Sequence, residues 1–254
     1  MNIKEIYSSS KSRIMTSLVL LLLGLAIFVT DNILLTWTIL GIAYLIAFYE
    51  AMALFGYKNN SFLAYALAIW LGAYIYPNPD DISFVVLIIA LSIMAHKKDV
   101  NYRILAPFIY PTIPMLFLFT LYKDFGVYPL IWLIVVVASS DVGAYVIGKG
   151  IGKTPFSNTS PNKTWEGTIG GILSATVLGT IMGLGSVSFT LALLISFLSA
   201  LSSVWGDLFE SYLKREANVK DSGDIFPGHG GMLDRIDGYM FAAIIMLVLL
   251  RGLL

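Results

Sequence analysis

The sequence contains no cysteine, only two histidines and few charged residues, which make up 13% of its 254 positions. Without cysteine, disulfide frameworks and thiolate metal sites are excluded. The 16 Lys and Arg residues balance 16 Asp and Glu residues, so no positive excess suggests nucleic acid, and we expect no nucleic-acid partner. With 57% hydrophobic residues, the chain is neither disordered nor an ordinary soluble domain. We therefore expect an integral membrane protein.

Long apolar stretches fill most of the chain, and its mean hydropathy is +0.81. A helix needs about 20 apolar residues to cross the hydrocarbon layer, so the sequence predicts an all-α, polytopic membrane protein with about nine transmembrane helices. These spans are expected near residues 14–30, 33–55, 61–76, 82–96, 103–122, 127–148, 166–185, 188–212 and 236–253.

The positions of the cations predict the orientation of these spans. With a cytoplasmic N-terminus, 14 of the 16 Lys and Arg residues fall on the cytoplasmic side, and only Lys123 and Arg251 fall outside. This positive-inside bias is typical of multi-pass membrane proteins. The two longest loops, at about 149–165 and 213–235, then both face the cytoplasm.

Polar residues are concentrated in the second half of the chain. We therefore divide it into residues 1–125, an N-terminal anchoring region of about five spans, and residues 126–254, a C-terminal catalytic region with both loops. Ionisable residues inside spans are energetically unfavourable in the bilayer, so they are functional candidates. The candidates are Glu50, Asp141, Asp207 and Glu210. All four are predicted near cytoplasmic helix ends, which favours a site open to the cytosol over a transporter's site at the midplane.

One face of the predicted eighth span carries polar residues at spacings of three or four, which align on a helix. They are Ser203, Asp207, Glu210, Ser211 and Lys214. Asp234 and Asp237 lie one turn apart at the start of the ninth span. If these two spans are antiparallel neighbours, Asp207 faces that pair. Such hard oxygen ligands favour Mg²⁺ over zinc. The alternative is that the acids only form salt bridges with neighbouring cations.

The two cytoplasmic loops have the composition of a phosphate-binding region. Lys214, Arg215 and Lys220 precede a glycine-rich tail, and glycines let backbone N–H groups approach oxyanions. An ordinary basic inner loop is the alternative. In the other loop, Ser160 and Thr164 are candidate caps of the seventh span, and Lys163 is placed to reach a phosphate there. Small-residue pairs within that span, Gly167/Gly171 and Gly179/Gly183, predict close helix packing.

Three segments resemble the phosphatidate cytidylyltransferase (CDP-diacylglycerol synthase) family, and together they cover the chain from about residue 139 onward. The longest runs Ser211-x-Leu213-Lys214-Arg215, Lys220-Asp221-x-Gly223 and Pro227-x-His229-Gly230-Gly231-Met232-x-Asp234-Arg235-Ile236-Asp237. The others are Ser160-Pro161-x-Lys163-Thr164-x-Glu166-Gly167 and Asp141-x-Gly143-Ala144-Tyr145.

The resemblance implies a multi-pass enzyme of the bacterial inner membrane, with its active site facing the cytoplasm. Such an enzyme joins CTP to phosphatidic acid, giving CDP-diacylglycerol and pyrophosphate, with Mg²⁺ as its metal and K⁺ as a candidate second cation. The expected partners are CTP, phosphatidic acid and membrane lipids, and a homodimer is left open. The implied catalytic residues are Asp207, Lys214 and Asp234, and the implied metal ligands are Asp207, Asp234 and Asp237. The implied substrate-binding residues are Lys163, Ser211, Arg215, Lys220, Asp221, His229 and Arg235.

The expected mechanism is in-line attack of a phosphatidate oxygen on the α-phosphorus of CTP, with the metal screening the two anions. Two other functions are weighed against it. A CTP-dependent kinase of a polyprenol-type lipid would transfer the γ-phosphoryl group and release CDP. An ion-coupled transporter would need acids spread through the bilayer and a broken helix near the midplane, neither of which the sequence predicts.

Overall fold

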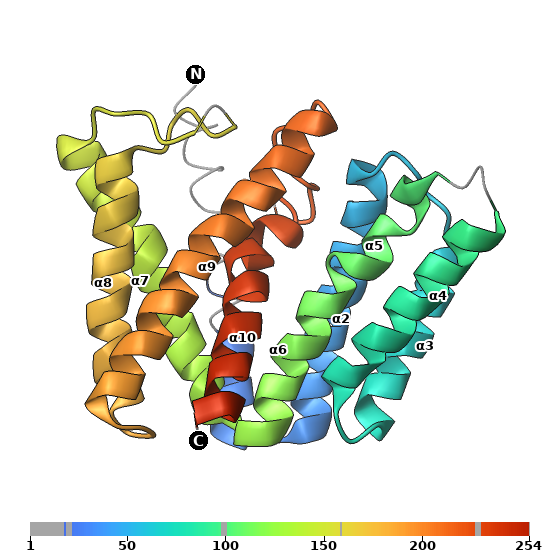
Figure 1. Cartoon of the computed structure of the whole chain (residues 1–254), viewed down its shortest axis with the longest axis horizontal. Coiled ribbons are helices and arrows are strands. Elements are labelled where there is room, and N and C mark those ends of the chain that lie inside the picture. The colour runs from blue at the N-terminus through green and yellow to red at the C-terminus, as the bar shows by residue number, and fades with distance from the viewer. Residues whose placement is uncertain (1–17, 19–21, 98–100, 158, 227–229, 254) are drawn as a thin grey trace. The chain divides into compact units, whose positions relative to one another are not determined.

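Helices form nearly all of the described chain (Figure 1). The computed structural model describes residues 18, 22–97, 101–157, 159–226 and 230–253. Within these ranges it contains α-helices and two short 3₁₀ helices, and no β-strand of more than an isolated bridge. The all-α class predicted from the composition is confirmed.

The helices follow the predicted apolar stretches closely in most of the chain. Of the first expected span, residues 22–30 are helical, and most of the remainder lies outside the described residues. The named elements are α2 (Ile33–Leu54), α3 (Ser61–Ile75), η1 (Pro79–Asp81), α4 (Ile82–His96), η2 (Tyr102–Ile104), α5 (Ala106–Ile109), α6 (Thr112–Phe125), α7 (Val127–Ile151), α8 (Trp165–Gly183), α9 (Phe189–Glu216) and α10 (Leu233–Leu253).

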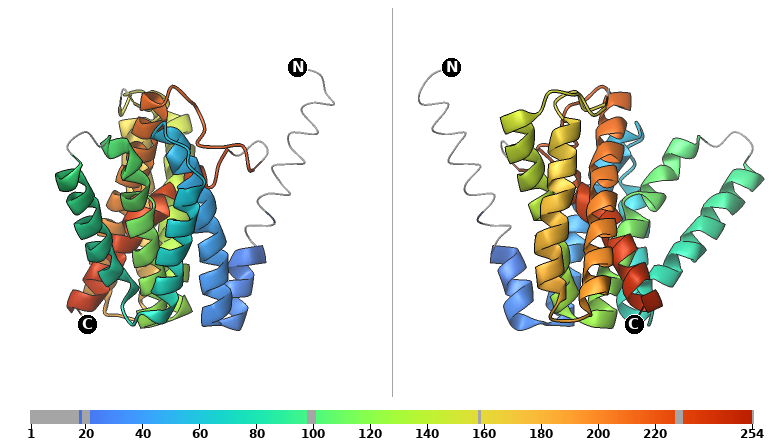
Figure 2. Two further views of the ribbon diagram at one scale, coloured as in Figure 1. Left: turned by 90° about the vertical axis from the view of Figure 1, so that its right-hand side faces the viewer. Right: turned by 60° about the vertical axis from the view of Figure 1, so that its left-hand side comes forward.

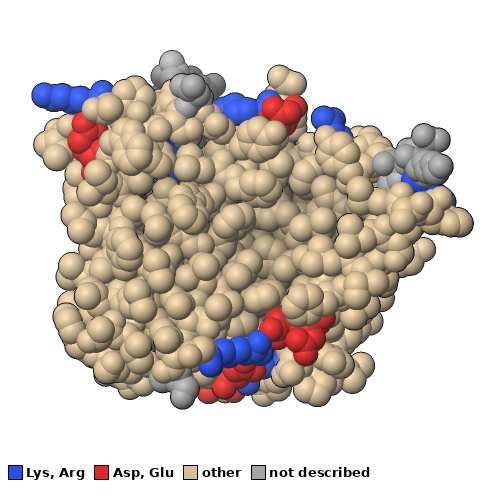
Figure 3. Space-filling model, viewed as in Figure 1, with Lys and Arg blue, Asp and Glu red and all other residues tan. Residues whose placement is uncertain are grey.

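Five helical segments in the described residues are long and apolar enough to cross a membrane. They are α2, η1 continued by α4, α7, α9 and α10. On the face drawn in Figure 3, charged side chains gather near helix ends, and uncharged residues form the surface between them. Both features support the membrane class. The number of nine spans and the cytoplasmic N-terminus stay predictions.

The expected span over residues 103–122 is not one helix, which corrects the sequence-based prediction. Its first part forms η2 and the four-residue α5, and α6 begins only at Thr112. Pro111 accounts for the break between α5 and α6, because it keeps the preceding residue, Tyr110, in an extended conformation, whereas Pro107 lies in the first turn of α5, where proline is tolerated. Apolar composition alone does not reveal such a break.

The chain folds into two compact units, and the division does not follow the order of the sequence. The first unit comprises residues 1–119 and 216–236, and the second comprises 120–215 and 237–254. Residues 216–236, which make up most of the loop between α9 and α10, therefore pack with the N-terminal helices. The division proposed at residue 125 did not anticipate this attachment.

In the second unit, α7 and α8 lie side by side along their lengths (Figures 1 and 2). Glycines on α8 allow this approach. A Cβ at Gly171 would lie 2.5 Å from the carbonyl oxygen of Ser140, and one at Gly167 would lie 2.7 Å from the carbonyl oxygen of Ala144. Two helix backbones can come this close only where small residues meet. The packing role predicted for the first glycine pair is confirmed.

Replacing Gly171 with leucine is expected to destabilise the second unit, because the side chain would overlap the backbone of α7. Overpacking of this kind costs about 1–3 kcal/mol or more and should lower the Tm measured in detergent. The matched control is Gly150→Leu, because nothing lies within 4 Å of a Cβ at that position of α7. Equal losses of Tm in the two variants would contradict the packing role.

Candidate functional site

The loop between α7 and α8 presents Lys163 beside the N-terminus of α8. Thr164 is the N-cap of that helix, since its hydroxyl accepts a hydrogen bond from the backbone N–H of Gly167 at 3.2 Å. The same loop is closed by Glu166, whose carboxylate accepts a hydrogen bond from the hydroxyl of Thr154 at 2.9 Å. Of the two candidate caps in the sequence, Thr164 is the one that the structure uses.

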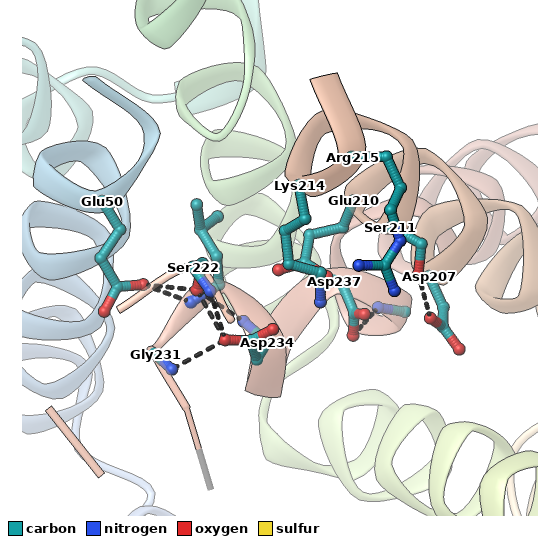
Figure 4. Close-up of polar contacts among 12 residues, drawn as sticks. Glu50, Asp207, Glu210, Ser211, Lys214, Arg215, Ser222, Gly231, Asp234 and Asp237 are labelled. Carbon is teal, nitrogen blue, oxygen red and sulfur yellow. Dashed lines mark hydrogen bonds and ion pairs between the residues drawn. The ribbon is translucent and has the colours of Figure 1, made fainter. Parts of the chain in front are cut away.

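Lys163 forms an ion pair with Asp207 of α9, although the two residues are 44 positions apart. Each side chain is 30% exposed, so the pair is accessible to a ligand. Ser211, one turn further along α9, donates a hydrogen bond to Oδ1 of Asp207 at 3.5 Å (Figure 4). The structure thus brings together three residues that the sequence had assigned to phosphate, metal and substrate binding.

A cavity of about 560 Å³ surrounds this ion pair, and all of its walls belong to the second unit. Its lining contains two lysines and two aspartates together with hydroxyl and amide groups, which can bind a charged, phosphate-bearing ligand. The polar lining residues are Ser140, Asp141, Tyr145, Lys149, Asn162, Lys163, Thr164, Thr168, Ser203 and Asp207. Asp141, whose role the sequence left open, is therefore part of this cavity.

The end of α9 carries two further site residues, and each has a partner within the second unit. Lys214 forms an ion pair with Glu210, one turn earlier, whose side chain is fully buried. Glu210 therefore forms a salt bridge with a neighbouring cation, as the alternative to metal binding predicted for the acids of this helix. Arg215 donates a hydrogen bond from Nε to the carbonyl oxygen of Thr159 at 3.4 Å, which ties the end of α9 to the loop before α8.

Asp237 lies where α10 approaches α9 within the second unit. A Cβ at Gly206 of α9 would collide with the carbonyl oxygen of Asp237, so only glycine permits this contact. The charges of Asp207 and Asp141 act on the carboxylate of Asp237, and so does that of Lys214. The antiparallel arrangement predicted for these helix ends therefore places Asp237 in the electrostatic field of Asp207.

Glu50 of α2 anchors the loop of the first unit that carries the longest motif. Its side chain is buried, and its two oxygens accept hydrogen bonds from the backbone N–H groups of Met232 at 2.9 Å and Leu233 at 2.8 Å. The hydroxyl of Ser222 lies 3.1 Å from Oε2 of the same carboxylate (Figure 4). The sequence had marked Glu50 as a candidate without giving it a role, and this contact supplies one.

Asp234 approaches Ser222 from the other side. Its Oδ2 accepts hydrogen bonds from the backbone N–H of Ser222, the hydroxyl of Ser222 and the backbone N–H of Gly231, each at 2.8 Å. Gly230, at φ +80°, adopts the left-handed conformation that glycine favours, and a Cβ there would lie 2.5 Å from Oδ2. Asp234 is thus an organiser of this loop, whatever else it binds.

The remaining motif residues are placed less specifically. Lys220 and Asp221 are exposed on the loop, and Arg235 is exposed in the first turn of α10. His229 lies outside the described residues, so its substrate contact stays a prediction. Sequence reasoning missed Ser222, although its place directly after Asp221 within the motif was a usable signal.

The described residues fit a Mg²⁺ site of the kind that substrate phosphates complete. No group of three or more His, Asp or Glu side chains in this part of the chain is arranged to hold a metal by itself. Mg²⁺ usually needs only one or two carboxylates, with water and phosphate oxygens filling the other positions. Asp207 and Asp237 supply two hard oxygen donors within one unit. Their chemistry therefore fits this metal.

The sequence matches known proteins over almost its whole length. A family model described as "Cytidylyltransferase family" matches residues 11–253. Proteins named phosphatidate cytidylyltransferase from two strains of Helicobacter pylori are each 46% identical to this chain, over 97% and 95% of it and over 94% and 92% of their own lengths. A Bacillus subtilis protein of the same name is 45% identical over 122 residues, which are 46% of this chain and 45% of that protein.

Proposed function

The chain belongs to the cytidylyltransferase family, and from this we infer that it is an enzyme that transfers the cytidylyl group of CTP to phosphatidate. The products are CDP-diacylglycerol and pyrophosphate, so the enzyme serves phospholipid synthesis. The observation that carries this conclusion is the 46% identity to a protein named phosphatidate cytidylyltransferase over 97% of the chain. The helices suited to crossing a membrane agree with a lipid substrate.

The activity is tested with purified protein, phosphatidate, Mg²⁺ and CTP labelled at either the α- or the γ-phosphorus. We expect the α-label to enter the lipid fraction and the γ-label to leave as pyrophosphate in equal amount. A CTP-dependent lipid kinase would instead place the γ-label on the lipid and release CDP. That second result would overturn the proposed function.

The triphosphate of CTP is assigned to the 560 Å³ cavity around Lys163. Two lysines, Lys149 and Lys163, lie in its wall, and the N-terminus of α8 adds backbone N–H groups with a favourable dipole. Lys163 holds Asp207 in the free protein and is positioned to pass to a phosphate oxygen when the nucleotide binds. Lys163 would therefore contact the metal-binding carboxylate of Asp207 before the nucleotide binds and a phosphate of the substrate afterwards.

Mg²⁺ is proposed to bind Asp207 and Asp237, and the resemblance adds Asp234 as a third ligand. When bound, the metal screens the repulsion between the two anionic substrates and stabilises charge on the leaving pyrophosphate. A protein base is not required, because the phosphate of phosphatidate is already ionised near neutral pH. We propose that contacts with the two substrates come from Ser211, Lys214, Arg215, Lys220, Asp221, His229 and Arg235.

The protein is proposed to lie in the bacterial cytoplasmic membrane with this site toward the cytoplasm. Within the second unit, Lys149, Lys163 and Lys214 lie at the end of α7, before α8 and near the end of α9, which are neighbouring helix ends. At the opposite ends, Arg251 of α10 pairs with Asp124 at 2.6 Å. The unequal distribution of lysines supports this orientation by the positive-inside rule. A homodimer stays open.

A further inference from the structure

We propose that Glu50 is a positioning residue for cytidylyl transfer: it holds the segment that carries Asp234 in its working conformation through Ser222 and the start of α10. This inference rests on the proposed function. Glu50 lies in an N-terminal helix to which the sequence gave only an anchoring role. Through Glu50, α2 would therefore help to position the residues of the active site as well as anchor the protein.

The first turn of α10 depends on an acceptor from another helix. The first N–H groups of any helix have no partner within it, and a carboxylate is well suited to accept them because the helix dipole favours negative charge there. Oε1 of Glu50 accepts from Met232 and Oε2 accepts from Leu233. The carboxylate therefore fixes where α10 begins, one residue before Asp234.

The glycines of the motif make room for this carboxylate. A Cβ at Gly223 would lie 2.5 Å from Oε1 of Glu50, and one at Gly231 would lie 2.5 Å from Oε2. Both glycines belong to the segment that resembles the family signature, and their lack of a side chain is needed for the loop to close over Glu50. Two of the motif's small residues are thus explained by a glutamate about 170 positions away.

Ser222 links the two carboxylates. Its hydroxyl lies 3.1 Å from Glu50 and 2.8 Å from Asp234, and it also accepts a hydrogen bond from the backbone N–H of Asp234 at 3.4 Å. One hydroxyl that serves both acids makes their orientations dependent on each other. Energetic coupling is expected where residues share one hydrogen-bond network.

The substitution Glu50→Gln keeps the size of the side chain but removes its charge and one of its two acceptor oxygens. Because both oxygens of Glu50 face N–H donors, one of these donors would meet the amide NH₂ in Glu50→Gln, where it finds no acceptor. We expect kcat for CDP-diacylglycerol formation to fall about 10- to 100-fold, the range seen when groups that orient metal ligands are altered. The Mg²⁺ concentration for half-maximal activity should rise. KM for CTP should stay close to the wild-type value, because the cavity assigned to the triphosphate is built from residues of the second unit.

A double-mutant cycle with Ser222→Ala tests the link between the two acids. Ser222→Ala alone should have a smaller effect, because Asp234 keeps its backbone donors, and the two changes together should cost less than the product of the single effects. Tyr44→Phe is the matched control, since it removes a buried hydrogen bond to Thr112 in the same unit. We expect it to lower Tm without changing the Mg²⁺ requirement.

Hydrogen exchange in the metal-free protein gives a readout that does not depend on activity. In Glu50→Gln, the amides of Met232 and Leu233 should exchange faster, while those of α7 and α8 stay unchanged. A wild-type Mg²⁺ requirement and kcat in Glu50→Gln, or fully additive effects in the cycle, would overturn the inference. If Glu50→Gln does not fold, Ser222→Ala carries the test. Failure of the wild-type protein itself to form CDP-diacylglycerol would instead refute the proposed function.

Discussion

Asp207→Asn is expected to lower kcat for CDP-diacylglycerol formation by about 1,000-fold or more. The change keeps the size of the side chain but removes the charge that would bind Mg²⁺ and pair with Lys163. Loss of a metal ion that stabilises transition-state charge removes several kcal/mol, and about 4 kcal/mol corresponds to a factor of 1,000 in rate. Transfer of the α-label from CTP to lipid measures the loss, and near-normal turnover would refute the metal assignment.

Two further variants separate the metal hypothesis from a plain salt bridge. Asp124→Asn removes an acid of the same unit that also pairs with a cation, and it should leave turnover close to the wild-type value. The double variant Lys163→Asp/Asp207→Lys restores an ion pair with its ends exchanged. If the pair were only structural, this exchange would recover activity. We expect none, because the carboxylate is no longer on α9.

The second large effect is expected at Asp234, where asparagine and alanine should be compared. In Asp234→Asn the side-chain carbonyl can still accept the hydrogen bonds from Ser222 and Gly231, so the loop should keep its conformation while the charge is lost. Asp234→Ala removes both the charge and the hydrogen-bond acceptor. If the carboxylate binds metal, both variants should lose activity by about 100-fold or more, which corresponds to about 2.7 kcal/mol of lost transition-state stabilisation.

Hydrogen exchange distinguishes the two Asp234 variants. Only the alanine variant should show faster exchange of the loop amides near Gly231. An asparagine variant with wild-type turnover would mean that Asp234 acts solely as a loop organiser, and it would remove this residue from the proposed metal ligands. The experiment therefore assigns the carboxylate to one role or to both.

The sequence singled out candidate site residues, but it did not predict the contacts that the structure gives them. The helical spacing on α9 and the cap before α8 were enough to single out Asp207, Lys163 and Thr164, because these signals are local. The direct pairing of Lys163 with Asp207 depends on how α8 and α9 pack. Packing between helices leaves no periodic pattern where most faces of the helices are apolar.

The role of Glu50 was out of reach for a related reason. An acid inside an apolar span indicates function, but its partners, Met232 and Leu233, contribute backbone N–H groups that no residue type reveals. The break before α6 shows the converse case. Pro111 is visible in the sequence, and proline geometry predicts a break at this position, where apolar composition predicts one continuous span.

The length of α9 has a consequence for where the two substrates meet. At 1.5 Å per residue, its 28 residues extend about 42 Å, whereas the hydrocarbon core of a bilayer is about 30 Å thick. A helix of this length that starts at one boundary of the core and runs along the bilayer normal would project about 12 Å beyond the other boundary, which is roughly its last eight residues. Those residues carry Glu210, Ser211, Lys214 and Arg215. In that arrangement they would lie in the layer of the lipid head groups, where a water-soluble nucleotide can reach the phosphate of a membrane lipid.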